Sequence, residues 1–266
     1  MLRYPDISPD IVRIGPFHLR WYGMMYVLGF IAGYLLVQRQ RRAREIGLVG
    51  PKAQDLILYL AIGLVVGARL GYILFYQYAD LAAYLKNPIE IIAVWHGGMS
   101  FHGGLLGAVA AGWWFARRNA MPFAVIADSV IVTAPVGLFF GRIGNFLNAE
   151  LYGRVTDVPW AMVFPNAGPL PRHPSQLYEA LGEGLLLFAV LWTLRKRRFA
   201  DGMMVAFFLC FYGAIRFVLE FFRQPDPQLG FIWGPFTMGQ LLCALMIAAG
   251  LVLALVLRRT GSRPAE

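Results

Sequence analysis

The sequence predicts an all-α polytopic membrane protein with seven transmembrane helices. Of its 266 residues, 58% are hydrophobic and only 15% are charged, and the mean hydropathy is +0.57. A soluble domain has about 45–50% apolar and about 25% charged residues. The excess of apolar residues is collected into runs of about 20, which is the length that crosses a bilayer core. We therefore expect a single integral-membrane domain over residues 1–266.

Seven apolar runs give the expected helices, and short charged loops separate them. In chain order the runs are Tyr22–Gln38, Asp55–Tyr78, Phe101–Arg117, Phe123–Phe140, Ser175–Leu194, Met203–Phe222 and Phe236–Leu257. Outside them we expect a hairpin of Ile11–Ile14 and Phe17–Arg20 around Gly15-Pro16, and a short strand within Trp160–Phe164. The first residues lack the pattern of a cleaved signal peptide, so the first run is expected to act as the insertion signal.

The distribution of basic residues predicts the orientation in the membrane. With alternating loops, 14 of the 24 Lys and Arg residues fall on one side and 8 on the other; the larger group includes Arg39–Lys52, Arg117–Arg118, Arg195–Arg198 and Arg258–Arg263. The positive-inside rule assigns the larger group to the cytoplasm. The N-terminus is then periplasmic, the C-terminus cytoplasmic, and the loops Gly141–Pro174 and Arg223–Pro235 lie outside. We expect an N-terminal arm and a small periplasmic head at about residues 142–174.

The net charge of +9 is therefore interpreted as topological rather than as a sign of nucleic-acid binding. The basic clusters flank apolar runs, where they orient helices and meet anionic lipid headgroups. We expect membrane lipid as a partner and no nucleic acid.

Ionisable residues within the runs are candidates for function. An arginine in the hydrocarbon region costs at least about 2.5–3.5 kcal/mol on insertion scales, so its presence is a functional hypothesis. Arg216 and Glu220 are spaced i, i+4 and can neutralise each other as a structural pair. Tyr212 and Arg223 lie at the same end of the run, which favours a polar site there. Arg69 stands among small residues and is compatible with either helix packing or substrate contact.

Two glycine-containing segments are candidates for anion binding. His102 lies in Gly97-Gly-Met-Ser-Phe-His-Gly-Gly104, where free N–H groups at a helix start favour a phosphate. The alternative is a turn that caps a helix, with His102 satisfied inside it. The second segment, Gly141-Arg-Ile-Gly-Asn-Phe-Leu-Asn-Ala-Glu-Leu-Tyr-Gly-Arg154, places Arg142 where it can fork onto a phosphate. With Arg216, these segments supply what an anionic phospholipid headgroup needs.

The remaining histidines and the cysteines suggest no metal centre. His18 and His96 are interpreted as surface or interface residues, and His173, just before Pro174-Ser175, as a cap of the fifth helix. No His-x₃-His or His-Glu-x-x-His spacing occurs, and Cys210 and Cys243 both lie in apolar runs. We expect no metal, no disulfide and no cofactor.

Five blocks of the sequence resemble the bacterial prolipoprotein diacylglyceryl transferases. They are Trp21-Tyr-Gly-Met-Met-Tyr26, Gly97-Gly-Met-Ser-Phe-His-Gly-Gly104, the segment Gly141–Arg154, Arg172-His-Pro-Ser-Gln-Leu-Tyr-Glu179 and Glu220-Phe-Phe-Arg-Gln-Pro-Asp226. The resemblance implies a multi-pass enzyme of the bacterial inner membrane with seven spans, an outward N-terminus and a periplasmic head. It implies transfer of the diacylglyceryl group of phosphatidylglycerol to the thiol of the lipobox cysteine in preprolipoprotein signal peptides, with release of glycerol phosphate.

The resemblance also implies which residues act. His102, Arg142 and Arg216 are expected to be catalytic; phosphatidylglycerol is expected to bind Tyr22, Arg142, Asn145, Glu150, Gly153, Arg216 and Glu220. The thiol can be activated by His102 as a base or by the arginine field alone, and the sequence leaves both open. A transporter of lipids or anions in the inner membrane is the alternative function; it predicts symmetry between halves, which the sequence does not show.

Overall fold

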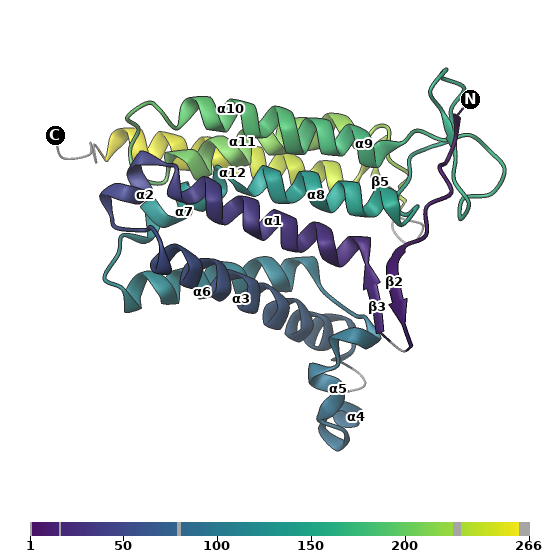
Figure 1. The fold of residues 1–266 in the computed structure, drawn as a ribbon. Coiled ribbons are helices and arrows are strands. Elements are labelled where there is room, and N and C mark those ends of the chain that lie inside the picture. The colour runs from purple at the N-terminus through teal and green to yellow at the C-terminus, as the bar shows by residue number, and fades with distance from the viewer. Residues whose placement is uncertain (1, 16, 79–80, 226–229, 261–266) are drawn as a thin grey trace. The chain divides into compact units, whose positions relative to one another are not determined.

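The structure is a computed structural model that describes residues 2–15, 17–78, 81–225 and 230–260 (Figure 1). Pro16, Asp226 and Arg263, which belong to segments named above, lie outside these ranges. Contacts divide the chain into two compact units. The first comprises residues 1–36 and 128–266, and the second comprises residues 37–127.

The first unit is built mainly from helices that lie side by side (Figure 1). They are α1 (Trp21–Gln38), α7 (Phe123–Ile131), α8 (Ala134–Leu147), α9 (Ser175–Glu179), the π-helical segment η3 (Ala180–Leu186), α10 (Leu187–Leu194), α11 (Met203–Leu219) and α12 (Met238–Arg259). Residues 37–38 at the end of α1 and residues 123–127 at the start of α7 belong to the second unit. α9, η3 and α10 form one uninterrupted helix of 20 residues, as the fifth apolar run predicts.

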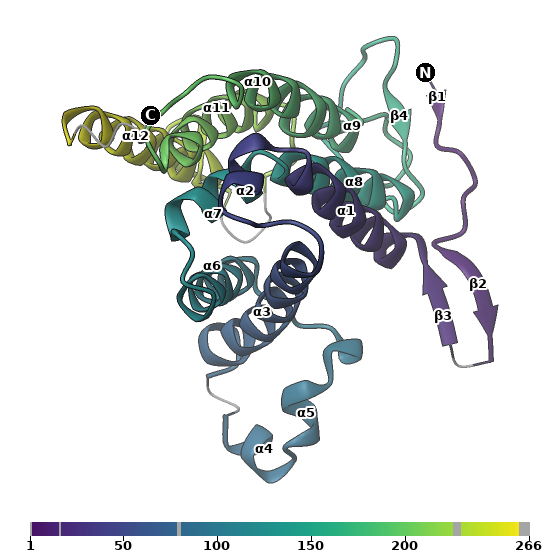
Figure 2. The same cartoon turned by 60° about the vertical axis from the view of Figure 1, so that its left-hand side comes forward.

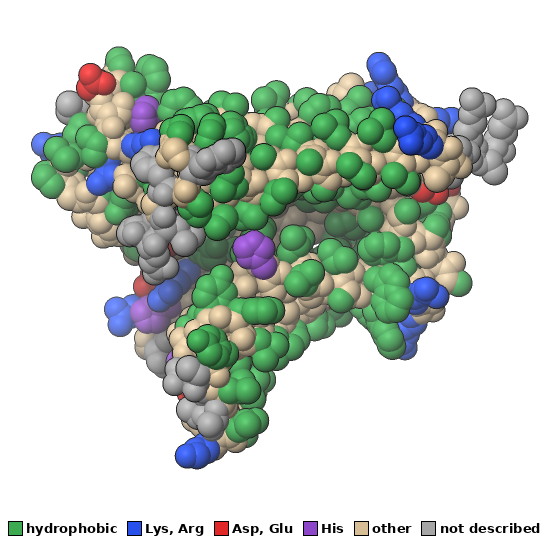
Figure 3. Space-filling model, turned by 180° about the vertical axis from the view of Figure 1, so that it is seen from behind, with side chains coloured by type: hydrophobic (Ala, Val, Ile, Leu, Met, Phe, Trp, Pro, Cys, Tyr) green, Lys and Arg blue, Asp and Glu red, His purple; other side chains and the backbone are tan. Residues whose placement is uncertain are grey.

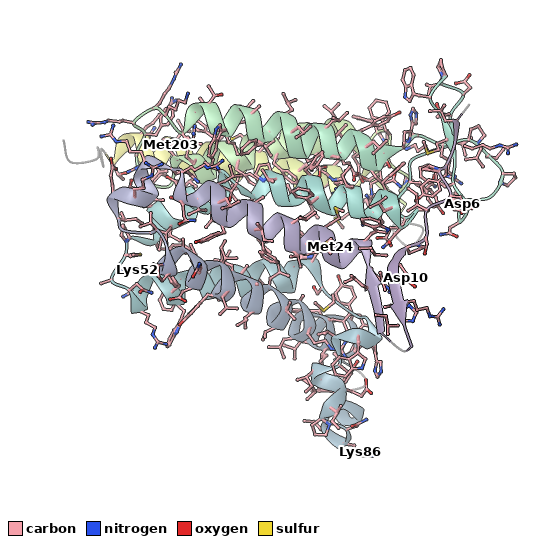
Figure 4. All side chains as sticks on the ribbon, in the orientation of Figure 1. Asp6, Asp10, Met24, Lys52, Lys86 and Met203 are labelled. Carbon is pink, nitrogen blue, oxygen red and sulfur yellow. The ribbon has the colours of Figure 1, made fainter. Side chains whose placement is uncertain are left out.

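The helices of the first unit approach closely at small residues and share an apolar core. Val132, Leu187, Leu191 and Met204 form a buried cluster. A Cβ on Gly184 would lie 2.6 Å from the Phe139 Cβ, so η3 and α8 are nearly in backbone contact there. Figure 4 labels Met203, at the start of α11, and Asp10, in the N-terminal hairpin, toward opposite ends of this unit.

The loop after α8 folds into a small head with its own core. β1 (Leu2–Arg3) pairs in parallel with β4 (Met162–Val163), so the N-terminal arm forms part of the head. Ala149, Met162 and Phe164 are buried, and Tyr4 packs on them while its hydroxyl donates to the Phe146 carbonyl at 2.7 Å. The predicted strand within residues 160–164 is confirmed, but it is limited to two residues.

Two hairpins flank the helices of the first unit. β2 (Asp10–Ile14) and β3 (Phe17–Arg20) form the predicted antiparallel hairpin, with Gly15 at φ +58° in the turn. β5 (Phe231–Trp233) and β6 (Phe236–Thr237) form a second hairpin that the sequence analysis does not predict. The last helix therefore starts at Met238 rather than Phe236, with Thr237 as its N-cap.

The second unit is organised around one tightly packed helix pair (Figure 2). Its elements are α2 (Arg41–Glu45), α3 (Pro51–Tyr76), α4 (Leu81–Lys86), α5 (Ile89–Ile92), the 3₁₀ turn η2 (Val94–His96) and α6 (Phe101–Arg118). α3 presents Gly63, Gly67 and Gly71 at every fourth position, and α6 presents Gly103 and Gly107 against them. A Cβ on Gly107 would lie 2.8 Å from the Gly67 Cα. Such small-residue faces bring membrane helices into backbone contact.

Within the described residues, four helices are long and apolar enough to cross a membrane: α1, α3, the α9–η3–α10 helix and α12. A fifth candidate is the pair α7 and α8, which bends by 41° at Val132–Thr133. The predicted run Phe123–Phe140 is divided between two helices: Pro135 in the first turn of α8 lacks the N–H that would continue α7, and α8 extends to Leu147, past the predicted end. α6 and α11 are present as helices, but α11 has only 17 residues. Hydrophobic side chains predominate on the face of the molecule that Figure 3 shows.

Candidate active site

Three arginines and three glutamates form a buried ion-pair network in the first unit. Arg142 lies on α8, Arg216 on α11 and Arg223 follows α11. Their partners, Glu179, Glu183 and Glu220, are all buried. The formal charges of these six side chains cancel, which is the condition for keeping so many ions out of water.

Glu179 joins all three arginines. Its Oε1 accepts from Arg216 Nη1 at 2.9 Å and from Arg223 Nη1 at 3.3 Å. Its Oε2 lies 3.0 Å from Arg142 Nε. One carboxylate thus fixes guanidinium groups from three parts of the chain.

Glu183 joins two of the same arginines one turn farther along. Its Oε2 accepts from Arg142 Nη2 at 3.1 Å, and its Oε1 lies 3.6 Å from Arg216 Nε. Glu183 belongs to the π-helical segment, a rare geometry that occurs frequently at functional sites. Arg142 and Arg216 are therefore bridged twice, by carboxylates on one continuous helix.

Glu220 completes the network from the end of α11. Its Oε2 lies 2.5 Å from Arg216 Nη2, which confirms the predicted i, i+4 ion pair. Its Oε1 accepts a hydrogen bond from the Thr237 hydroxyl at 2.9 Å. Arg216 is held by three carboxylates, and the N-terminus of α12 is tied to the same site.

The arginine side chains of the network are more exposed to solvent than the glutamate side chains. The side chains of Arg142, Arg216 and Arg223 retain 17%, 14% and 15% of their accessible surface, whereas Glu179 and Glu183 retain 1% and 0%. The arginine side chains are therefore more accessible to a ligand than the carboxylates that hold them. Guanidinium forks match phosphate and carboxylate ligands, so this cluster is suited to an anion.

Other predicted site residues lie on α8, on α1 and in the loop that follows α8. Asn145, on α8, is buried and its Nδ2 donates to Glu150 Oε1 at 2.8 Å. The Tyr22 hydroxyl bonds to the Tyr26 hydroxyl at 3.1 Å, and the Tyr22 ring packs beside Gly144 of α8. Tyr22 is also close enough to interact electrostatically with Glu150 and Arg142. Arg142 and Asn145 are helical rather than part of the loop predicted after Phe140, because α8 extends to Leu147.

Gly153 lies where two backbone segments cross over the network. Its N–H donates to the His173 carbonyl at 2.9 Å, and it forms a β-bridge with Arg223. A Cβ there would lie 2.7 Å from the His173 Cβ and also overlap the Phe222 carbonyl, so only glycine fits. The adjacent Arg154 donates from Nε to the Arg223 carbonyl at 2.9 Å. The contacts of Gly153 and Arg154 thus fix the backbone at Arg223, directly after α11.

His173 links the head to the first turn of α9, but its side chain does not cap the helix as predicted. Its Nδ1 bonds to the Tyr178 hydroxyl at 3.1 Å, and the Trp160 Nε1–H donates to that same hydroxyl at 2.6 Å. Pro174, not His173, occupies the N-cap position, and no side chain caps that end. Burial lowers the pKa of His173, since the imidazolium form is less well solvated there.

Two candidate residues lie in the second unit. His102 is exposed in the first turn of α6. The glycines around it have packing roles: Ser100 Oγ accepts from the Gly103 N–H at 3.2 Å, and Gly103 packs against α3. This supports the interpretation of the segment as a turn that caps a helix. His18 and His96 are exposed and bond to Asp10 and Glu90, as surface residues.

Arg69 has a structural role. Its guanidinium donates to four backbone carbonyls, at 3.1 Å to Ile91, 2.6 Å to Gly97, 3.1 Å to Gly98 and 2.5 Å to Glu90. These bonds hold the segment between α5 and α6 onto α3. The structure supports the helix-packing interpretation over substrate contact.

Glu179 and Glu183 are not among the site residues predicted from the sequence. Both are ionisable residues inside the apolar run Ser175–Leu194, which is the same signal that identified Arg216 and Glu220. Their i, i+4 spacing places two carboxylates on one helix face. The signal was therefore available in the sequence.

Comparison with known proteins places the chain in a family. Residues 9–256 match the family model described as prolipoprotein diacylglyceryl transferase. The phosphatidylglycerol–prolipoprotein diacylglyceryl transferase of Geobacter sulfurreducens is 51% identical over 97% of this chain and 98% of its own length. The proteins of the same name from Nitratidesulfovibrio vulgaris and Pseudomonas paraeruginosa are each 49% identical, over 94% and 99% of this chain and 95% and 99% of their own lengths. The chain belongs to the prolipoprotein diacylglyceryl transferase family.

Proposed function

We propose that this chain transfers the diacylglyceryl group of phosphatidylglycerol to a cysteine thiol of a prolipoprotein, and that Arg142 and Arg216 hold the lipid phosphate. The observation that carries the proposal is the network in which partly exposed arginines are held by the buried carboxylates Glu179 and Glu183. The phosphodiester of phosphatidylglycerol is a permanent anion. A face of guanidinium groups fits it.

The chemistry requires a nucleophile and a stabilised leaving group. The thiolate sulfur attacks the sp³ carbon of the glycerol backbone that bears the phosphate, the C–S bond forms, and the C–O bond electrons leave on glycerol phosphate. Negative charge gathers on the phosphate during this step, so fixed arginine charges stabilise the transition state. One such preorganised donor contributes about 2.7–4 kcal/mol in comparable sites. The substrate cysteine is expected to be that of the lipobox in the signal peptide.

The remaining predicted residues have supporting roles in this proposal. Glu220 orients Arg216, and Tyr22, Asn145 and Glu150 lie where hydrogen bonds to the phosphate or glycerol headgroup are expected. Gly153 keeps the head close to the arginine network. His102 is proposed as the base for the thiol, and the arginine field as its alternative.

The proposed localisation is the bacterial inner membrane, with one domain of seven spans over residues 1–266. The periplasmic N-terminus, the outward head at about residues 142–174 and the cytoplasmic C-terminus follow from the count of basic residues. Cysteine labelling tests this orientation, in a protein whose Cys210 and Cys243 are replaced by alanine. A cysteine at position 197 should resist an impermeant reagent in intact cells; its reaction would refute the orientation.

The activity is tested with purified protein, phosphatidylglycerol in mixed micelles and a cysteine-containing lipobox peptide. Arg142→Ala should abolish formation of the thioether, and Arg142→Lys should restore little, since lysine lacks the planar fork. Arg41→Ala removes an exposed arginine paired with Glu45 and serves as the matched control. Near-normal transfer by Arg142→Ala would refute the phosphate assignment. Movement of lipid between leaflets without thioether formation would favour the transporter alternative.

A further inference from the structure

The negative charges of Glu179 and Glu183 oppose the binding of an anion at Arg142 and Arg216. Arg142 and Arg216 are bridged by both Glu179 and Glu183, so the two negative carboxylates largely neutralise the positive charge that would attract a phosphate. If attraction were the only requirement, an uncompensated arginine pair would bind more strongly. Burying two carboxylates is costly, although Glu179 alone already contacts all three arginines.

The products of the reaction explain why balance is useful. Phosphatidylglycerol carries a phosphodiester with one negative charge. Glycerol phosphate is a phosphomonoester, and its second ionisation near pH ~6 gives it nearly two negative charges at neutral pH. A cluster of unbalanced arginines would therefore hold the product more tightly than the substrate. Release of glycerol phosphate would then limit the rate, as product release does in many enzymes.

The two carboxylates differ in what they hold. Glu179 contacts Arg142, Arg216 and Arg223, and its removal would free all three. Glu183 contacts only Arg142 and Arg216, and its Oε1 is 3.6 Å from the nearest arginine nitrogen, beyond hydrogen-bond distance. Without the Glu183 charge, the bridge from Arg142 through Glu179 to Arg216 remains. Glu183 is thus the carboxylate whose charge is separable from its structural role.

We propose that Glu183 is a counter-charge residue that weakens the hold of Arg142 and Arg216 on glycerol phosphate and so permits product release, while Glu179 is the residue that positions the arginines. The inference rests on the proposed function. It assigns to Glu183 an effect on binding and release of phosphate esters, not on the bond-making step. We therefore expect the loss of the Glu183 charge to lower both the KM for phosphatidylglycerol and the kcat.

The test compares Glu183→Gln, which keeps the shape and removes the charge, with the intact enzyme. The KM for phosphatidylglycerol and the inhibition constant of added glycerol phosphate should both fall, the latter by about tenfold, because an opposing charge a few ångströms away is removed. The kcat should fall as release becomes limiting. Added glycerol, which has no charge, should inhibit both proteins equally. Glu45→Gln removes an exposed carboxylate that pairs with Arg41 and should change none of these constants.

Two further measurements keep the inference falsifiable. Glu183→Asp retains the charge, so its glycerol phosphate inhibition should stay near that of the parent; a shift equal to that of Glu183→Gln would refute the inference. Direct titration of glycerol phosphate by calorimetry reports binding even if a variant has no activity, and unchanged affinity in folded Glu183→Gln would also refute it. If the parent protein forms no thioether, the proposed function fails. If it does and only these binding constants are unchanged, the inference alone fails.

Discussion

The Thr237 hydroxyl donates a hydrogen bond to Glu220 Oε1 at 2.9 Å, across 17 positions of the chain. Thr237 is also the N-cap of α12, where its Oγ1 accepts from the Gln240 N–H at 3.3 Å and the Gln240 side chain completes a capping box. The other oxygen of Glu220 lies 2.5 Å from Arg216. The start of α12 therefore fixes a carboxylate that orients a proposed phosphate-binding arginine.

Gly239→Ala tests this coupling. A Cβ at this position would lie 2.7 Å from Glu220 Oε1, so the carboxylate must move away from Thr237 or Arg216. Transfer activity should fall by at least about tenfold, equivalent to about 1.4 kcal/mol of transition-state stabilisation. The melting temperature should not fall in proportion, since alanine favours the helix by about 0.8–1 kcal/mol over glycine.

The control for this variant is Gly137→Ala on α8, where an added Cβ meets no atom within 4 Å. Kinetic assays and thermal unfolding of both variants separate displacement of Glu220 from a general effect of alanine. Full activity of Gly239→Ala would show that the exact place of Glu220 is unimportant.

Gly107→Leu should separate α3 from α6. A Cβ at Gly107 would lie 2.8 Å from the Gly67 Cα and also overlap the Gly63 carbonyl, and neither backbone can yield without parting the helices. Overpacking of this kind costs about 1–3 kcal/mol or more. We expect a lower melting temperature in detergent. Ala110→Leu places the same side chain on an exposed position of α6 and should unfold like the parent; equal stability of the two variants would contradict the tight pairing.

The stability of the head should decrease in acid through His173. Because burial lowers the pKa of His173, the unfolded chain binds a proton at higher pH than the folded head does. This contribution to stability is complete above about pH 6.5, the ordinary histidine value, and is lost as pH falls through the lower folded value. Protonation also removes the Nδ1 acceptor that faces the Tyr178 hydroxyl.

Thermal unfolding at pH 7.5 and pH 5.5 measures this effect. The drop in melting temperature between the two values should be smaller in His173→Gln than in the parent. His96→Gln, which alters an exposed histidine, should retain the whole drop. An undiminished drop in His173→Gln would exclude His173 as its source.

Much of the fold follows from the sequence because membrane helices depend on local composition. The apolar runs Tyr22–Gln38 and Ser175–Leu194 correspond closely to helices of the structure, and the hairpin on both sides of Gly15 is present. The break at Val132–Thr133 was missed because an apolar run conceals a bend that depends on Pro135. The π-helical segment was missed too, since no local pattern distinguishes it from an α-helix.

The site was predicted in part for a similar reason. The pairing of Arg216 with Glu220 follows from spacing along one helix. The bridges from Glu179 to Arg142 and Arg223 join residues 37 and 44 positions apart, and they depend on how three segments pack. The anion-binding interpretation of the glycines around His102 did not take into account that Gly103 and Gly104 pack against α3, which is also a tertiary property.

The substrate thiol is activated either by His102 as a base or by the arginine field alone, and replacement of His102 distinguishes these two explanations. If His102 is the base, His102→Gln should lose about 10²–10⁴-fold in rate, the usual contribution of general acid–base catalysis. It should also lose the fall in rate on the acid side, since that fall reports protonation of the base. If the arginine field activates the thiol, the variant should keep most of its activity, and its rate should still follow ionisation of the substrate cysteine.

We expect the result for a base, since His102 is exposed in the first turn of α6 and is therefore accessible to a substrate thiol. The measurement is the pH–rate profile of purified parent and His102→Gln with phosphatidylglycerol and a lipobox peptide. His96→Gln, an exposed histidine paired with Glu90 in the same unit, controls for loss of an imidazole. If His102→Gln is nearly as fast as the parent at pH 8 and keeps the same profile, then His102 is not the base. The arginine network would then carry thiol activation as well as phosphate binding, because Arg142, Arg216 and Arg223 have the partly exposed cationic side chains of the proposed site.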